Sequence, residues 1–202
     1  YVEGKQMAFH NPNESAAAGI ACVYQELNIE KLLSITDNIF INKWKKGPGG
    51  LLDYGYMHKK AKEVMASLGQ DVDPTKPAGT FGMGVQQMIE IAKAIQQNAQ
   101  VLIMDEPTAN LDYGNMVRMI NRIRALRDHG YGIIMTTHSP DQAFMCDSRV
   151  VFLRRDAPVV TGPVQDIITE KNMLDVYGVK IRVIEFLDEK NRVSRVCSPL
   201  LD

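Results

Sequence analysis

Cysteine is scarce in this sequence, and long apolar runs are absent. The three cysteines are odd in number, far apart and outside any CxxC motif: Cys22, Cys146 and Cys197. A disulfide framework or a zinc site is therefore not expected, and free thiols favour a reducing compartment. No apolar run reaches the ~18 residues that a membrane-spanning helix needs, and no signal peptide is recognised at the start.

An excess of charge of one sign is also absent. The 23 lysines and arginines nearly balance the 24 aspartates and glutamates, which leaves a formal net charge of −1 over 202 residues. Overall charge therefore gives no reason to expect a nucleic acid as partner. Internal repeats and low-complexity tracts are lacking as well. With 45% hydrophobic residues, the chain suits one domain, or one domain with a subdomain.

What the sequence does contain is an alternation of short apolar runs and amphipathic segments. Continuous apolar runs predict buried strands over residues 19–24, 100–104 and 130–137. The helical spacing of apolar side chains predicts helices over residues 51–68, 85–96 and 115–128. A helix from residue 141 to 146 and a strand from 149 to 153 continue the alternation. This order predicts an α/β fold with a parallel sheet, whose ligands bind at the carboxyl ends of the strands.

The connecting segments and the tail have other patterns. Residues 25–44 are mixed in character, residues 45–50 (KKGPGG) form a loop by composition, and residues 69–79 form a connector with two prolines. From Thr169 onward, the sequence predicts a helix over residues 171–177 and strands over 180–184 and 192–197. A turn at residues 188–191 predicts an antiparallel hairpin, which we interpret as an appended element and not as a separate domain.

The strongest functional signal is the string VLIMDEPTANLD at residues 101–112. Asp105 leaves the predicted strand where its carboxylate could hold Mg²⁺ or a water bound to that ion. Glu106 could orient and deprotonate an attacking water. A strand that simply ends in solvated acids is the alternative for a bare Asp-Glu pair. The complete string favours a nucleotide-hydrolysing site.

Together, these motifs resemble the nucleotide-binding domain of ATP-binding cassette (ABC) transporters. Asp105 and Glu106 resemble the Walker B acid and the catalytic glutamate, and residues 109–112 (ANLD) resemble the D-loop. His138, in TTHS, resembles the switch histidine that reaches the γ-phosphate in this family. Gln25, in VYQEL, resembles the Q-loop glutamine that touches Mg²⁺ and the attacking water. The motifs occur in the family's order and spacing and cover nearly the whole chain.

The resemblance implies a RecA-like P-loop NTPase core, here partial, with a helical subdomain and a C-terminal hairpin extension. It divides the chain into four regions: residues 1–26 as the remnant of the N-terminal β-rich part with the Q-loop, 27–95 as the helical subdomain with the signature helix, 96–168 as the Walker B, D-loop and switch-histidine core, and 169–202 as the extension.

The resemblance also implies ligands and the residues that hold them. ATP and Mg²⁺ are the expected cofactors. Glu106 and His138 would be catalytic, and Gln25, Asp105, Gly84 and Asp112 would bind the nucleotide. Asp105 and Gln25 would contact Mg²⁺ directly or through water. The other three histidines match no family motif and are predicted to be surface residues: His10, His58 and His129.

Two motifs depart from the family pattern. The phosphate-binding motif GxxxxGK[ST] is lacking, since the only Gly-Lys pair, Gly4-Lys5, is followed by a glutamine. In the family this motif lies upstream of the Q-loop, so we expect it before the present first residue and expect this chain alone to be inactive. The signature stretch reads FGMGV at residues 81–85, with Gly84 kept but Gly82 in place of the serine and Val85 in place of the glutamine.

The resemblance predicts the ATP-binding subunit of an importer of a small solute. The first half of the chain resembles monosaccharide importers, whereas the second half resembles importers of iron-siderophores, haem or cobalamin. Implied partners are transmembrane permease subunits, a second nucleotide-binding domain and, indirectly, a solute-binding protein; no nucleic acid is expected. The implied location is peripheral, at the cytoplasmic face of the cell membrane.

Two alternatives remain open at this point. A truncated or pseudo-cassette that binds a partner without hydrolysing ATP would fit the two departures. A cassette ATPase of DNA repair or translation is disfavoured by the near-neutral charge and the importer-like stretches.

Overall fold

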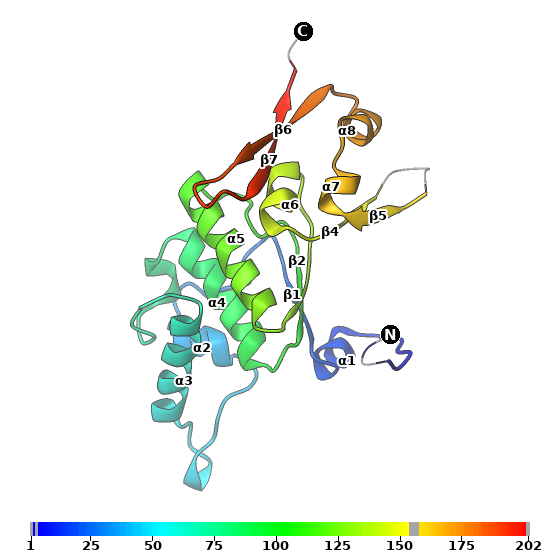
Figure 1. Cartoon of the computed structure of the whole chain (residues 1–202). Helices are drawn as coiled ribbons and strands as arrows, with labels where there is room; N and C mark the ends of the chain where they lie inside the picture. The colour runs from blue at the N-terminus through cyan, green and yellow to red at the C-terminus, as the bar shows by residue number, and fades with distance from the viewer. Residues whose placement is uncertain (1, 3, 154–157, 201–202) are drawn as a thin grey trace. The chain divides into compact units, whose positions relative to one another are not determined.

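The computed structural model describes residues 2, 4–153 and 158–200, which fall into two compact units, Tyr1–Thr136 and Thr137–Asp202. The first unit contains a parallel sheet in the order β1-β2-β3, formed by Ile20–Val23, Val101–Met104 and Gly132–Met135. Its register aligns Val23 with Met104 and Met104 with Met135, so the three strands end side by side. The predicted α/β fold with a parallel sheet is confirmed (Figure 1).

The three strands differ in how deeply they are buried. Central strand β2 carries the fully buried side chains of Leu102 and Met104. Strand β3 at the sheet edge alternates between exposed and half-buried residues, and Ile134 is 60% exposed. The prediction that this run is buried was therefore wrong. Strand β3 lies at the sheet edge and pairs with a neighbour on one side, so part of its apolar surface stays uncovered.

Two long helices support the sheet. Helix α4 spans Met83–Gln96 and contacts β1, whereas α5 spans Tyr113–Asp128 and contacts β3. Both agree with the predicted helices to within two residues. The apolar face of α5 is buried as expected, with Met119, Ile120 and Ile123 each less than 5% exposed. Since α4 and α5 also contact each other, they join the sheet to the rest of the first unit.

A helical layer packs on the far side of α4. It consists of α2 (Ile35–Phe40) and α3 (Tyr54–Ser67), and both helices contact α4. Its core includes five side chains with no exposed surface: Ile35, Ile39, Met57, Met65 and Ile89. Asp53 caps α3 by accepting a hydrogen bond from Tyr56 N at 2.9 Å, as the sequence predicted.

Helix α2 lies in the segment that the sequence left as mixed. Its six residues give too few turns for a periodic signal, although Ser34 and Asp37 form a reciprocal capping box at its start. His58 was predicted to be a surface residue, and this prediction was wrong. Its ring is half-buried, and its Nδ1 lies 2.8 Å from the hydroxyl of the fully buried Thr36. His10 and His129 are exposed, as predicted.

Short elements complete the first unit. Helix α1 spans Pro12–Ala17, and two 3-10 turns span Pro48–Gly50 (η1) and Ala78–Thr80 (η2). The η1 turn lies inside the KKGPGG segment, so the predicted loop is confirmed.

The second unit is built from short helices and antiparallel strand pairs. Its elements are α6 (Pro140–Cys146), β4 (Arg149–Phe152), β5 (Val160–Pro163), α7 (Val164–Ile167), α8 (Glu170–Tyr177), β6 (Ile181–Leu187) and β7 (Val193–Pro199). Strands β6 and β7 form the predicted hairpin. Strand β4 pairs antiparallel with β5 and does not join the parallel sheet of the first unit. The sequence did not indicate this antiparallel pairing.

The second unit has its own small core of Ala143, Val164, Ile168, Met173 and Ile181. Cys146 is buried, and all three cysteines of the chain are free thiols, as predicted. Burial raises the pKa of the Cys197 thiol to about 11, with a smaller contribution from the Asp141 carboxylate. Among the described residues, no helix has the length and apolar character needed to span a bilayer.

Candidate functional site

The predicted acidic pair lies where β2 ends beside the end of β3. Asp105 N donates to Val23 O at 2.9 Å, and Thr136 N donates to Met104 O at 2.9 Å, which extends both strand ladders by one residue. The Thr136 hydroxyl donates to Asp105 Oδ1 at 2.6 Å and accepts a hydrogen bond from Glu106 N at 3.0 Å. One hydroxyl therefore fixes the carboxylate of the first acid and the backbone of the second.

Thr136 was not predicted as a site residue. A signal for it exists, since it comes directly after the last residue of β3 and therefore stands at the same sheet edge as Asp105. The position of its hydroxyl depends on the pairing of β2 with β3, which aligns Met104 with Met135. A single sequence does not show which strands pair, so it does not predict this contact of Thr136.

The backbone turns sharply directly after Asp105. Glu106 has a φ of 44°, in the left-handed region that residues other than glycine seldom adopt. Ala109 N donates to Glu106 O at 2.9 Å and closes a tight turn over the buried Pro107 and Thr108. The turn leaves Asp105 exposed and Glu106 half-buried at the sheet edge. A strained backbone held by this much local bonding is typical of functional sites.

Asp112 caps the helix after this turn. Its carboxylate accepts hydrogen bonds from Asn115 N at 2.8 Å and from Asn115 Nδ2 at 2.6 Å. The backbone hydrogen bond from Asn115 is the main reason why the pKa of Asp112 lies below its usual value. The carboxylate is thus ionised and already engaged by α5, and its predicted contact with a nucleotide stays a prediction.

Gly84 lies in the first turn of α4, close to α5. A Cβ at this position would come within 3.3 Å of Asn115 Oδ1, an atom that also accepts a hydrogen bond from Arg118 at 3.0 Å. The glycine therefore allows the signature helix to approach the capped start of α5. Gly82 is the N-cap residue of α4 and, having no side chain, provides no capping hydrogen bond.

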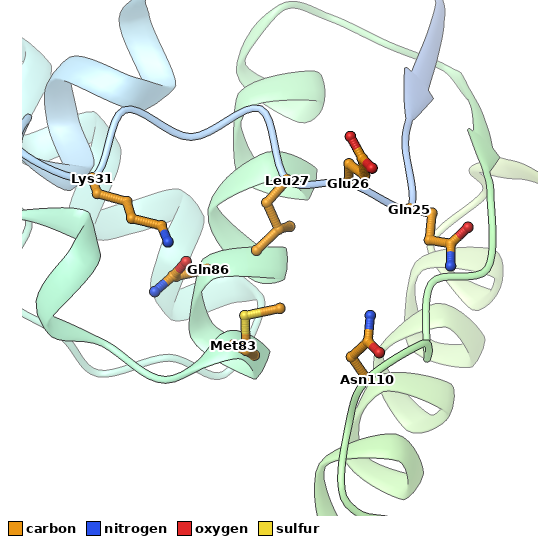
Figure 2. A pocket seen from close by; sticks show the side chains of 7 residues that line it. All are labelled: Gln25, Glu26, Leu27, Lys31, Met83, Gln86 and Asn110. Carbon is orange, nitrogen blue, oxygen red and sulfur yellow. The ribbon is translucent and has the colours of Figure 1, made fainter.

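Gln25 opens onto a cavity of about 400 Å³ that three distant segments line together (Figure 2). The lining residues come from the chain after β1, from the start of α4 and from the turn after β2: Gln25, Glu26, Leu27, Lys31, Met83, Gln86 and Asn110. The predicted Q-loop, signature stretch and D-loop thus share one space. The sequence placed Asn110 in the D-loop without a role of its own, and it did not single out Lys31 or Gln86 as site residues.

Gln86 is the most deeply buried polar side chain of this cavity. It is 6% exposed, and its amide nitrogen donates to Phe81 O at 2.6 Å. Its Oε1 has no hydrogen-bond partner among the described residues. Figure 2 shows the Lys31 side chain pointing toward the Gln86 amide, on the side of the cavity away from Gln25 and Asn110. A buried oxygen without a partner is costly, so Gln86 is the least satisfied polar group beside this cavity.

His138 belongs to the second unit, whereas the acidic pair belongs to the first, so the proximity predicted for them stays a prediction. Within its own unit, His138 is exposed and lies in a short bonded segment before α6. Ser139 N donates to Thr137 Oγ1 at 3.0 Å, and Thr137 Oγ1 donates to Gln142 Oε1 at 2.8 Å. These bonds fix the backbone on both sides of the histidine.

The acidic pair suits a Mg²⁺ ion that a nucleotide brings with it. Among the described residues, no group of three or more histidine, cysteine, aspartate and glutamate side chains could enclose a metal ion. Mg²⁺ normally uses one or two carboxylates together with waters and substrate phosphates. Asp105 and Gln25 are both exposed in the segments that follow β2 and β1, and their role as ligands of such an ion stays a prediction. When bound, the ion would neutralise charge on the phosphates.

Comparison with solved structures identifies the class of this fold. A chain of an ABC transporter assigned to the metal-chelate type, in an inward-facing conformation, matches with a TM-score of 0.77 over 91% of this chain and 72% of that one, at 18% identity. An ATP-binding cassette of an ABC transporter in its ADP conformation matches with a TM-score of 0.72 over 87% and 74%, also at 18% identity. The fold is that of ABC ATPase domains.

The sequence comparisons give the family. The model of the family described as ABC transporter matches residues 1–109, more than half of the chain. The chain therefore belongs to the ABC transporter family, as the motifs suggested.

Curated relatives of this chain are sugar-import proteins. The ribose import ATP-binding protein RbsA 1 of Streptomyces coelicolor is 36% identical over 81% of this chain and 32% of its own length. The galactose/methyl galactoside import ATP-binding protein MglA of Escherichia coli K12 is 31% identical over 96% of this chain and 38% of its own length. The chain thus spans about a third of the length of these relatives.

Proposed function

We propose that this protein is the ATP-binding subunit of an ABC importer that couples ATP binding and hydrolysis to the uptake of a small solute. The observation that carries the proposal is the sheet edge at which Thr136 holds both Asp105 and Glu106. Family membership supports it, since the relatives are import ATP-binding proteins.

Each polar group at this edge has a role in the proposal. Asp105 and Gln25 hold Mg²⁺ directly or through water, and Glu106 accepts a proton from the attacking water. His138 contacts the γ-phosphate. Gly84 and Asp112 contact nucleotide held by a second nucleotide-binding domain.

The solute class that the comparisons favour is sugar. Relatives whose names refer to ribose, arabinose and galactose import match three quarters or more of this chain. The iron-siderophore class suggested by the later part of the sequence has support only from fold similarity at 18% identity. Transmembrane permease subunits, a second nucleotide-binding domain and, indirectly, a solute-binding protein are the proposed partners.

Nucleotide titration tests this proposal. The assembled ATPase, which contains the family's phosphate-binding motif and a second nucleotide-binding domain, is titrated with a fluorescent ATP analogue in the presence of Mg²⁺. The titration is repeated with Asp105→Asn and with Mg²⁺ replaced by EDTA. The proposal expects saturable binding that both changes weaken. Absence of binding by an assembly whose far-UV circular dichroism shows it to be folded would contradict the proposal.

A cassette that does not hydrolyse ATP is the second candidate. It is favoured by Gly82, which leaves the start of α4 without the hydroxyl of the family's signature serine. Nucleotide binding without any phosphate release, unchanged by Gly82→Ser, would support it. Phosphate release that Gly82→Ser increases would favour the importer ATPase.

A further inference from the structure

A lysine-rich segment, residues 43–56, follows α2, includes the first turn of α3 and forms an ordered projection, here called the 43–56 loop. Lys46 and Leu52 make an antiparallel bridge, Gly47 N donates to Leu51 O at 2.8 Å, and Asp53 N donates to Lys45 O at 2.9 Å. The tip is the η1 turn, in which Gly49 and Gly50 have φ values of 76° and 80°. The loop extends beyond the N-terminal end of α3 (Figure 1). It is thus a defined hairpin and not an unstructured linker.

The 43–56 loop exposes apolar side chains near its tip. Leu51, directly after the turn, is 78% exposed, and Leu52 beside it is 40% exposed. Tyr54 and Tyr56 lie at the base and are 43% and 39% exposed. Single exposed leucines are ordinary, but adjacent leucines on a projection with two tyrosines below them form an apolar surface that a partner could cover.

The same stretch of sequence is rich in positive charge. Residues 41–62 contain six lysines and one acid, Asp53, although the whole chain is nearly neutral. Asp53 is occupied by capping α3, and Lys60 pairs with Glu63 at 2.8 Å. The ion pairs of the described residues do not include Lys43, Lys45 or Lys46, which are all exposed.

We propose that the 43–56 loop docks on the anionic headgroup surface of a lipid bilayer. Leu51 enters the interface, the three lysines contact lipid phosphates, and the tyrosines lie at headgroup level. Lysine stems can lie along apolar surface while their ammonium groups stay at the phosphates, and tyrosine rings favour this boundary. An acidic protein surface would attract the same lysines but would need a pocket matched to the projecting Leu51, which a bilayer interface does not need.

This docking goes beyond the proposed transport role, which requires only contact with a permease. It needs neither nucleotide nor a second domain, and vesicle binding is measured without them. Failure of the nucleotide titration and failure of membrane binding are therefore separate results.

Vesicle co-sedimentation tests the proposal on the full chain. Vesicles of phosphatidylcholine are compared with vesicles that also contain phosphatidylglycerol. Binding is expected to the anionic vesicles only and to weaken with added salt. Replacing Lys43, Lys45 and Lys46 by glutamine is expected to reduce affinity by about fivefold per lysine. Leu51→Asp is expected to reduce it by a further ~10-fold or more.

Matched controls come from the second unit. Lys171→Gln, Lys180→Gln and Lys190→Gln remove three exposed lysines elsewhere, and Leu153→Asp alters a leucine that is also 78% exposed. These variants are expected to bind like the wild type. Equal losses in test and control variants, or unchanged binding by the test variants, would overturn the proposal. So would binding to polyglutamate that does not depend on Leu51, together with absence of vesicle binding, because this points to an acidic protein.

Discussion

Strands β2 and β3 are neighbours in one parallel sheet, yet they differ in burial and in the side chains at their carboxyl ends. Strand β2 holds Leu102 and Met104 with no exposed surface and leads directly into Asp105. Strand β3 exposes 60% of Ile134 and leads directly into Thr136. The buried strand therefore supplies the acids, and the exposed edge strand supplies the hydroxyl that holds them.

The comparison of β2 with β3 shows how hydrogen bonds can fix a site at a sheet edge that is only partly buried. Parallel pairing places the ends of both strands at one level, so a single hydroxyl reaches two consecutive residues of the neighbouring strand. Antiparallel pairing, as between β6 and β7 in the second unit, places the end of one strand beside the start of the other. Three predictions test how far the functions of β2 and β3 are separate.

The largest effect is expected at the end of β2. Glu106→Gln removes the proposed base while keeping the size of the side chain. It should lower ATP turnover in the assembled ATPase about 10²–10⁴-fold, as measured by phosphate release, while Mg²⁺-ATP binding persists. Asp128→Asn, an exposed acid at the end of α5, is the control and should leave turnover unchanged. Undiminished turnover in the Glu106→Gln variant would remove this residue from its proposed role.

The second prediction compares the interiors of the two strands. Leu102→Ala leaves a cavity beside the centre of the sheet and should lower the free energy of unfolding by about 2–5 kcal/mol. Ile134→Ala, on the adjacent strand, should cost less than about 1 kcal/mol because this side chain is largely exposed. Urea denaturation monitored by circular dichroism measures both. Similar losses would show that a partner surface covers β3 in solution.

Features that depend on neighbours along the chain were predictable from the sequence. The cap at Asp53 and the amphipathic faces of α3, α4 and α5 depend on side chains within one or two turns. The strand that precedes Asp105 is also predictable from its own apolar run. These local signals were enough for the fold class and for the family motifs.

Features that depend on long-range pairing were not predictable. The exposure of β3 results from its place at the sheet edge, and the role of Thr136 results from its pairing with a residue 31 positions away. His58 is half-buried because Thr36, 22 positions away, lies beside it. The antiparallel pairing of β4 with β5 likewise depends on the tertiary structure and not on local sequence. A single sequence gives the order of the residues but does not show which distant residues become neighbours in space.

The smallest expected effect concerns the hydroxyl at the end of β3. Thr136→Val keeps the shape of the side chain but removes the donor to Asp105 and the acceptor for Glu106 N. Because the site is exposed, water replaces part of what is lost, and the free energy of unfolding should fall by only about 0.5–1.5 kcal/mol. Thr136→Ser retains the hydroxyl and should preserve Mg²⁺-dependent nucleotide binding, whereas Thr136→Val should weaken it. Equal nucleotide affinity in the two variants, measured by fluorescence titration, would mean that β2 alone positions its acids and that β3 serves only to pair with it.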